Sequence, residues 1–173
     1  MYAHRTPLCP RTAGAYVHDR APMMTAGTAD HAEVLAALHA TSFPQSWSAE
    51  EFASLLRQPG VASWIVSDGR EPSGFILIRA AADEAEILTL AVTPEHRRKG
   101  YAGALLHEAF AALSPGIVQQ MFLEVAADNT GALALYERHG FTVCGRRSGY
   151  YAGAAKSIDA ILMRRRLSAD ACC

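Results

Sequence analysis

The 173-residue sequence contains no long hydrophobic run. None of its apolar stretches approaches the ~20 residues that a helix needs to cross a bilayer, and residues 1–22 lack the apolar central block of a secretory signal. The four cysteines do not show the paired spacing of a zinc site; they are Cys9, Cys144, Cys172 and Cys173. We therefore expect a cytoplasmic protein with reduced thiols, no bound metal and no membrane partner.

The sequence also lacks an excess of either charge, with 16 Lys and Arg against 17 Asp and Glu and a formal net charge of −1. A protein that binds nucleic acid without sequence preference usually carries a large basic excess, so we expect no direct nucleic-acid partner. Half of the residues are hydrophobic, which is typical of one folded domain at this length. We assign the domain to residues 23–167, between an N-terminal extension of unknown role (1–22) and a C-terminal tail (168–173).

Hydrophobic periodicity and capping signals predict four helices. The first is expected at residues 29–41 with Asp30 as its N-cap, and the second begins after Ser48, which forms a capping box with Glu51. A third helix runs from the turn near residue 100 to about residue 113. The fourth lies within 128–140, capped by Asp128 or Asn129 and closed by Gly140.

Strands are expected between and after these helices. Three of them, at 62–67, 74–81 and 86–92, are separated by short turns and are therefore expected to form an antiparallel meander. Further strands are expected at 119–126, 141–147 and 157–166. The alternation of helices and strands indicates a mixed α/β domain with one central sheet.

The segment TPEHRRKGYAGALL, residues 93–106, joins an expected strand to an expected helix. Such a turn exposes several backbone N–H groups in one direction, and these donors at the positive end of a helix form an anion site. Gly100 would let a phosphate approach the backbone, and Arg97, Arg98 and Lys99 add positive charge. Neither the P-loop pattern nor the dinucleotide-binding pattern fits these residues. Taken alone, the segment is equally compatible with an ordinary surface turn.

Two separated segments resemble the GCN5-related N-acetyltransferase (GNAT) family. LTLAVTPEHRRKGYAGALLHEAF resembles its acetyl-CoA motif, whose core Arg/Gln-x-x-Gly-x-Gly/Ala reads here Arg97-x-x-Gly100-x-Ala102. FLEVAADNTGALALYERHGFTVCGRRSGYY is similar to the ribosomal-protein alanine N-acetyltransferase (RimI) branch. The resemblance covers about residues 24–166. It implies the GNAT fold, a central, mostly antiparallel, twisted sheet of about six to seven strands with helices on both faces.

The resemblance implies acetyl-CoA as cosubstrate and assigns residues to it. In the family the loop amides hold the pyrophosphate, and the preceding strand lines the pantetheine arm. The loop residues implied here are Arg97, Arg98, Lys99, Gly100, Tyr101, Ala102 and Gly103. The strand residues implied are Leu90, Ala91 and Val92. Asn129, which also suits a helix cap, is implied to contact the cosubstrate.

Glu124 is the candidate general base, acting directly or through water. Alternation along its strand places it on one face with Phe122 and Ala126, and such apolar neighbours would favour proton uptake near neutral pH. From the strand alone, a glutamate paired with a cation at the surface is equally compatible. The resemblance favours the base.

Tyr136 is the candidate general acid, which would protonate the departing thiolate. We expect it to face outward from its helix with Ala132, Leu133 and Gly140, the alternative being an aromatic packed in the core. The resemblance favours the acid.

Tyr150 and Tyr151 are candidates for lining the acceptor groove, or for covering the sheet edge. Trp47 is a candidate on the same side, with a packing role as its alternative.

The expected activity is transfer of acetyl from acetyl-CoA to a protein N-terminal α-amine, by direct transfer in a ternary complex. The resemblance implies an alanine-headed small-subunit ribosomal protein as acceptor. A second hypothesis is a GNAT enzyme that acetylates a small-molecule amine such as an amino sugar, a polyamine or an amino acid. A third is a non-catalytic acyl-CoA-binding module, against which the presence of both Glu124 and Tyr136 counts.

Overall fold

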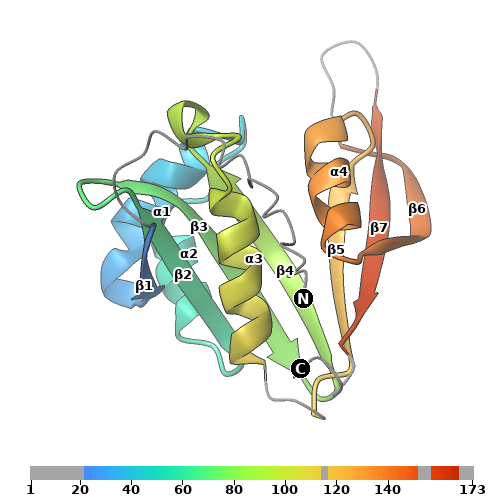
Figure 1. Cartoon of the computed structure of the whole chain (residues 1–173), viewed down its shortest axis with the longest axis horizontal. Helices are drawn as coiled ribbons and strands as arrows, with labels where there is room; N and C mark the ends of the chain where they lie inside the picture. The colour runs from blue at the N-terminus through green and yellow to red at the C-terminus, as the bar shows by residue number, and fades with distance from the viewer. Residues whose placement is uncertain (1–21, 114–116, 152–156, 168–173) are drawn as a thin grey trace, which may run out of the picture.

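The computed structural model describes residues 22–113, 117–151 and 157–167. Its strands form one seven-stranded sheet with helices packed against it (Figure 1). The strands are β1 (Met23–Gly27), β2 (Val61–Ser67), β3 (Pro72–Ala81), β4 (Glu84–Val92), β5 (Gln120–Ala126), β6 (Thr142–Tyr151) and β7 (Ile158–Arg166). The α-helices are α1 (Ala32–Ala40), α2 (Ala49–Leu56), α3 (Tyr101–Ala112) and α4 (Thr130–Arg138), and the 3-10 helices are η1 (Ala29–His31) and η2 (Pro94–His96).

The strand order is β1-β2-β3-β4-β5-β7-β6. β4 and β5 are parallel, because the chain crosses from the end of one to the start of the other through α3. The other neighbouring pairs in the described chain are antiparallel. The predicted sheet, mostly antiparallel and built on the meander of β2, β3 and β4, is therefore confirmed.

Helices cover both faces of the sheet, as predicted. Along β3, Ile76 and Ile78 pack in the cluster that contains the buried face of α3. The alternate residues Phe75 and Leu77 pack in a second cluster with α1 and α2, because side chains alternate between the two faces of a strand. α4 lies on the α3 side, where Tyr136 joins the first cluster.

The two capping predictions have different outcomes. At α2 the capping box is confirmed: Glu51 N donates to Ser48 Oγ at 3.2 Å, and Ser48 N donates to Glu51 Oε2 at 2.7 Å. At the first helix the prediction of Asp30 as N-cap is wrong. Asp30 lies inside the short η1 turn, whose N-cap is Thr28, and the Thr28 backbone N–H donates to His31 Nδ1 at 3.1 Å. η1 leads directly into α1, whose own N-cap is His31.

No strand was predicted at β1. Its five residues, MMTAG, are exposed or half-buried and do not alternate in hydrophobicity. They form a strand because they pair in register with β2, from Met23 opposite Ser67 to Gly27 opposite Ser63. Tertiary pairing rather than local preference defines this element.

His39 orders the connection between α1 and α2. Its side chain is buried, and its ring stacks on Phe43 and Trp47 with centroid separations of 4.2 and 5.0 Å. Trp47 N donates to His39 Nδ1 at 3.1 Å, which requires that nitrogen to carry no proton. Burial lowers the pKa of His39, and the charge of Glu51 opposes this effect. Folding therefore favours the neutral imidazole.

We expect His39 to make stability fall in acid. Its pKa is lower in the folded chain than the ordinary value of 6.5, so the unfolded chain binds the proton first as the pH falls. The neutral His39 therefore stabilises the fold above about pH 6.5. This stabilisation is lost as the pH falls through the folded pKa, and the free energy of unfolding decreases by at most about 1.4 kcal/mol per pH unit. Chemical denaturation of His39→Gln at pH 7.5 and 5.0 should show a smaller pH difference than wild type. Exposed His107→Gln serves as the control, and an unchanged pH difference in His39→Gln would contradict this account.

Candidate active site

β4 and β5 pair with each other only at their first residues. The register joins Glu84 to Gln120 and Glu86 to Phe122. Beyond these pairs the two strands diverge (Figure 1), although β4 continues to Val92 and β5 to Ala126. The edge of β4 that faces β5 is therefore free of strand pairing over residues 87–92, a length of roughly 20 Å. Its outward N–H and C=O groups have no partner in β5 here, and apart from Val92 O, which accepts a hydrogen bond from Arg97 Nε, they suit a ligand that lies between the strands.

The three predicted β4 residues lie along this unpaired edge. Leu90 is half-buried against the α3 cluster, whereas Ala91 is buried against α1 and α2. Val92 is buried on the α3 side, at the end of the strand. Sequence reasoning missed their neighbour Thr89, whose hydroxyl oxygen is buried without a hydrogen-bond partner among the described residues. The edge thus combines free backbone groups with side chains that are held in the core.

The glycine turn ends at the N-terminus of α3. Arg98 and Gly100 both have left-handed backbone angles, with φ of 63° and 88°, and Gly100 is the N-cap residue of α3. No side chain caps this helix end, which leaves its first N–H groups available to an anion. A Cβ placed on Gly100 would meet no atom within 4 Å. The space in front of the helix is therefore open.

The remaining turn residues have different surroundings. Arg97 holds the turn, because its Nε donates to Val92 O at 3.1 Å and its Nη2 donates to Ser42 Oγ at 3.3 Å. Tyr101 is buried and stacks on His96 at 5.7 Å. The others lie around the same helix start: Arg98 and Lys99 are exposed, Ala102 packs against the core, and a Cβ on Gly103 would lie 3.2 Å from His139 Nε2. All three cations of the turn are thus exposed, and Arg97 differs from Arg98 and Lys99 in being held by hydrogen bonds.

Glu124 lies on β5 with its side chain on the face opposite α3 and α4. Phe122 and Ala126 share this face, as predicted, while Leu123 and Val125 are buried on the helix side. The expectation of an apolar setting is wrong, however. Arg147 on β6 donates from Nη1 to Glu124 Oε1 at 2.8 Å. The carboxylate is therefore paired with a cation to which the sequence analysis assigned no role.

Tyr136 lies on α4 and is buried, so the expectation that it faces outward is wrong. Its ring packs edge-to-face against Phe141 at 5.6 Å, within the cluster that also holds Leu123 and Val125 of β5. The helix turns this residue inward because α4 presents its apolar side to the sheet. Tyr136 and Glu124 therefore approach β5 from its two opposite faces.

The other candidates lie around this centre. Asn129 is the N-cap of α4, and its Oδ1 accepts a hydrogen bond from Ala132 N at 3.1 Å, which confirms one of the two predicted caps. Tyr150 is on β6, where its ring lies 4.2 Å from the Arg147 guanidinium carbon. Tyr151 ends β6, and its side chain falls outside the described part. Trp47 packs on His39 and Phe52, as its packing alternative predicted.

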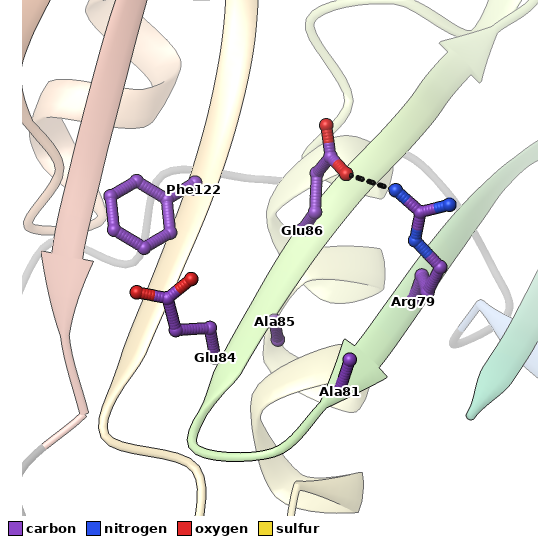
Figure 2. A pocket seen from close by; sticks show the side chains of 6 residues that line it. All are labelled: Arg79, Ala81, Glu84, Ala85, Glu86 and Phe122. Atoms are coloured by element: carbon purple, nitrogen blue, oxygen red, sulfur yellow. Dashed lines mark hydrogen bonds and ion pairs between the residues drawn. The ribbon is translucent and has the colours of Figure 1, made fainter.

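A pocket of about 290 Å³ lies at the start of the β4–β5 pair (Figure 2). Its lining consists of Arg79, Ala81, Glu84, Ala85, Glu86 and Phe122. Arg79 and Glu86 form an ion pair of 2.9 Å across its rim. None of the predicted site residues lines it, but Phe122 is two residues from Glu124 on the same face of β5.

The described residues contain no group of three or more His, Cys, Asp or Glu side chains placed to hold a metal ion. None of the described helices has the length and apolarity needed to cross a membrane.

Comparison with known proteins shows the family to which the chain belongs. Residues 32–141 match the acetyltransferase (GNAT) family. The chain is 32% identical over 150 residues to the [ribosomal protein bS18]-alanine N-acetyltransferase of Escherichia coli (strain K12), covering 84% of this chain and 99% of that protein. The chain therefore belongs to the GNAT family of N-acetyltransferases, and the resemblance to the RimI branch is confirmed.

Two solved structures have similar folds. The crystal structure of the ribosomal-protein-S18-alanine N-acetyltransferase from Escherichia coli superposes with a TM-score of 0.79 at 26% identity, covering 86% of this chain and 95% of that one. Arabidopsis thaliana NAA60 in complex with acetyl-CoA gives a TM-score of 0.76 at 22% identity, covering 85% and 99%. The GNAT fold predicted from the sequence is confirmed.

Gly100 provides a test of the acetyl-CoA site. Gly100→Glu would place a carboxylate in the open space before α3, where it repels a diphosphate, so we expect acetyl-CoA affinity to fall at least 100-fold. Gly100→Ala imposes the same backbone strain, of about 1–2 kcal/mol, with little bulk and no charge. Calorimetric titration of both variants should show a much smaller loss for alanine. Equal affinities for the two variants would argue against an anion at this position.

Proposed function

We propose that this chain transfers the acetyl group of acetyl-CoA to the α-amine of a protein N-terminus, and that the acceptor is a small-subunit ribosomal protein beginning with alanine. The single observation that carries the proposal is the divergence of β4 and β5 with Glu124 beside it. It is supported by the Escherichia coli relative, whose name states a ribosomal protein alanine as its own acceptor. The two segments that resemble the family, one at the glycine turn and one around Glu124, follow each other along the chain in the family's order. They support the same acceptor class.

The residues around the opening suit acetyl-CoA. The uncapped N–H groups of α3, with Arg98 and Lys99, would hold the diphosphate, while Arg97 keeps the turn in shape. The unpaired edge of β4 at Leu90, Ala91 and Val92 would hydrogen-bond the pantetheine arm, whose amides need partners of this kind. Gly100 would allow close approach, with Tyr101, Ala102 and Gly103 forming the first turn behind it. Asn129 would face the same ligand from the start of α4. When bound, acetyl-CoA supplies the acetyl thioester.

Glu124 and Tyr136 would move the two protons of the reaction. The acceptor nitrogen forms a bond to the acetyl carbon, and its surplus proton passes to Glu124 directly or through water. The carbon–sulfur bond breaks, and the thiolate takes its proton from the Tyr136 hydroxyl. No enzyme-bound acetyl group is required, so both substrates are present together. Tyr150, Tyr151 and Trp47 would border the acceptor groove.

The chemistry of the amine favours a protein N-terminus over a lysine side chain. An α-amine with a pKa near 7.8 costs about 1 kcal/mol to deprotonate at pH 7, whereas a lysine near 10.4 costs about 4.6 kcal/mol. A modest base such as the Glu124 carboxylate therefore suffices for the easier task.

The acceptor class is tested by CoA release with two matched peptides. One begins with a free alanine and has its lysines replaced, and the other has a blocked N-terminus and one internal lysine. We expect release to be at least 100-fold faster with the alanine peptide, because its amine is far more often neutral. Equal or faster lysine turnover would contradict the N-terminal assignment, and turnover of neither peptide would favour a small-molecule amine.

The proton-transfer roles are tested by Glu124→Gln and Tyr136→Phe. Each change removes one proton acceptor or donor, so we expect kcat to fall about 100-fold or more while the affinity for acetyl-CoA stays within threefold. Glu86→Gln is the matched control, because Glu86 is also a paired glutamate on this face of the sheet. Its kcat should remain near wild type. Full activity in either test variant would remove that residue from the mechanism.

A further inference from the structure

We propose that Arg147 is the positioning residue for the general base: it fixes one oxygen of Glu124 and leaves the other oxygen to receive the proton of the acceptor amine. The inference rests on the proposed role of Glu124. It adds to that role a residue, on a different strand, that sets the orientation of the base.

The contact itself supports a positioning role. Arg147 Nη1 donates to Glu124 Oε1 at 2.8 Å, a short charge-assisted hydrogen bond. The Glu124 side chain is 26% exposed, so solvent screens the pair only in part. No contact among the described residues engages Glu124 Oε2. One carboxylate oxygen is therefore held, and the other remains available.

Arg147 reaches Glu124 by crossing β7. It pairs with Ala160 of β7, and Ala160 pairs on its other side with Ala126 of β5. Glu124 lies two residues before Ala126, on the same face. Ala160 is fully buried and carries only a methyl group, so the arginine stem can pass over it. A small residue at this register position is what lets the guanidinium span two strands.

A β-bulge selects Arg147 rather than Arg146 for this contact. β6 pairs Val143 with Met163 and then Gly145 with Leu162, so Cys144 is an extra residue in the strand. Without it, every following side chain would turn to the other face. Arg146 instead pairs with Asp159, its Nε donating to Oδ2 at 2.6 Å. The two adjacent arginines thus form ion pairs with different carboxylates.

One further contact holds the guanidinium in place. Its carbon lies 4.2 Å from the ring centre of Tyr150, a distance at which cation and aromatic ring attract. The hydrogen bond and the charge of Glu124, with a smaller effect from Tyr150, raise the pKa of Arg147. Arg147 is therefore a permanent cation, held between the carboxylate of Glu124 and the ring of Tyr150.

The test is steady-state kinetics at pH 8 with the alanine peptide as acceptor, in which kcat and KM are measured separately. In Arg147→Gln the carboxylate loses the hydrogen bond that orients it, so we expect kcat to fall about tenfold while the KM for the peptide and the affinity for acetyl-CoA stay within threefold of wild type. Arg147→Lys keeps a cationic donor and should restore kcat to within threefold of wild type.

Arg146→Gln is the matched control, because it removes the same charge from the adjacent residue and breaks a similarly exposed ion pair. Its kcat should stay within threefold of wild type, and its melting temperature should match that of Arg147→Gln. The proposal is overturned if Arg147→Gln keeps the wild-type kcat, or if Arg147→Lys loses as much kcat as Arg147→Gln. An equal fall of kcat in Arg146→Gln would overturn it as well.

The two proposals fail in distinguishable ways. If wild type acetylates a different amine, the acceptor assignment fails, and the kinetics of the same variants are recorded with that amine. If Glu124→Gln keeps the wild-type kcat, the positioning role fails while the acceptor assignment stands.

Discussion

Backbone N–H and C=O groups need partners, and beyond Glu86 those of β4 that face β5 have none in the sheet. The cost of such an edge is tolerable only where water or a ligand completes the hydrogen bonds. Everything proposed for this chain is arranged around that edge. The uncapped helix α3 begins past its end, Glu124 lies on the opposing strand, and α4 begins just after that strand.

Where the sheet divides, contacts on the helix side link the two parts, and Arg165 of β7 makes these contacts. Its guanidinium carbon lies 3.9 Å from the ring centre of Phe110 on α3, and its Nη1 donates to His139 O at the end of α4 at 2.9 Å. His139 in turn lies against Gly103, where the absence of a side chain allows the close approach. Arg165 therefore links α3 to α4 on the helix side of the sheet, across the opening between β4 and β5. Burial lowers the pKa of Arg165, as expected for a charge placed among packed helices.

Much of this architecture follows from local sequence signals, and the parts that do not have identifiable causes. Alternation placed β2 to β5 correctly, and the Ser48 box and the Gly100 turn placed two helix starts. β1 was missed because pairing with β2 creates it. Tyr136 was given the wrong face because the inward side of a short helix depends on what it packs against. The partner of Glu124 was missed because the bulge residue Cys144 determines which arginine faces Glu124. The local sequence contains no pattern that predicts a bulge.

The opposed placement of Glu124 and Tyr136 bears on how the proposed reaction would run. Leu123 and Val125 share a core with Tyr136, whereas Glu124 points to the other face of the same strand. A proton taken from the amine and a proton given to the thiolate would then be exchanged on opposite sides of β5. In this proposal the two faces would communicate where β4 and β5 have separated, because backbone pairing closes the sheet where they are paired. An amine arriving from the Arg147 side and a thioester lying against the helix side would meet in that gap, which is the geometry that direct transfer in a ternary complex requires.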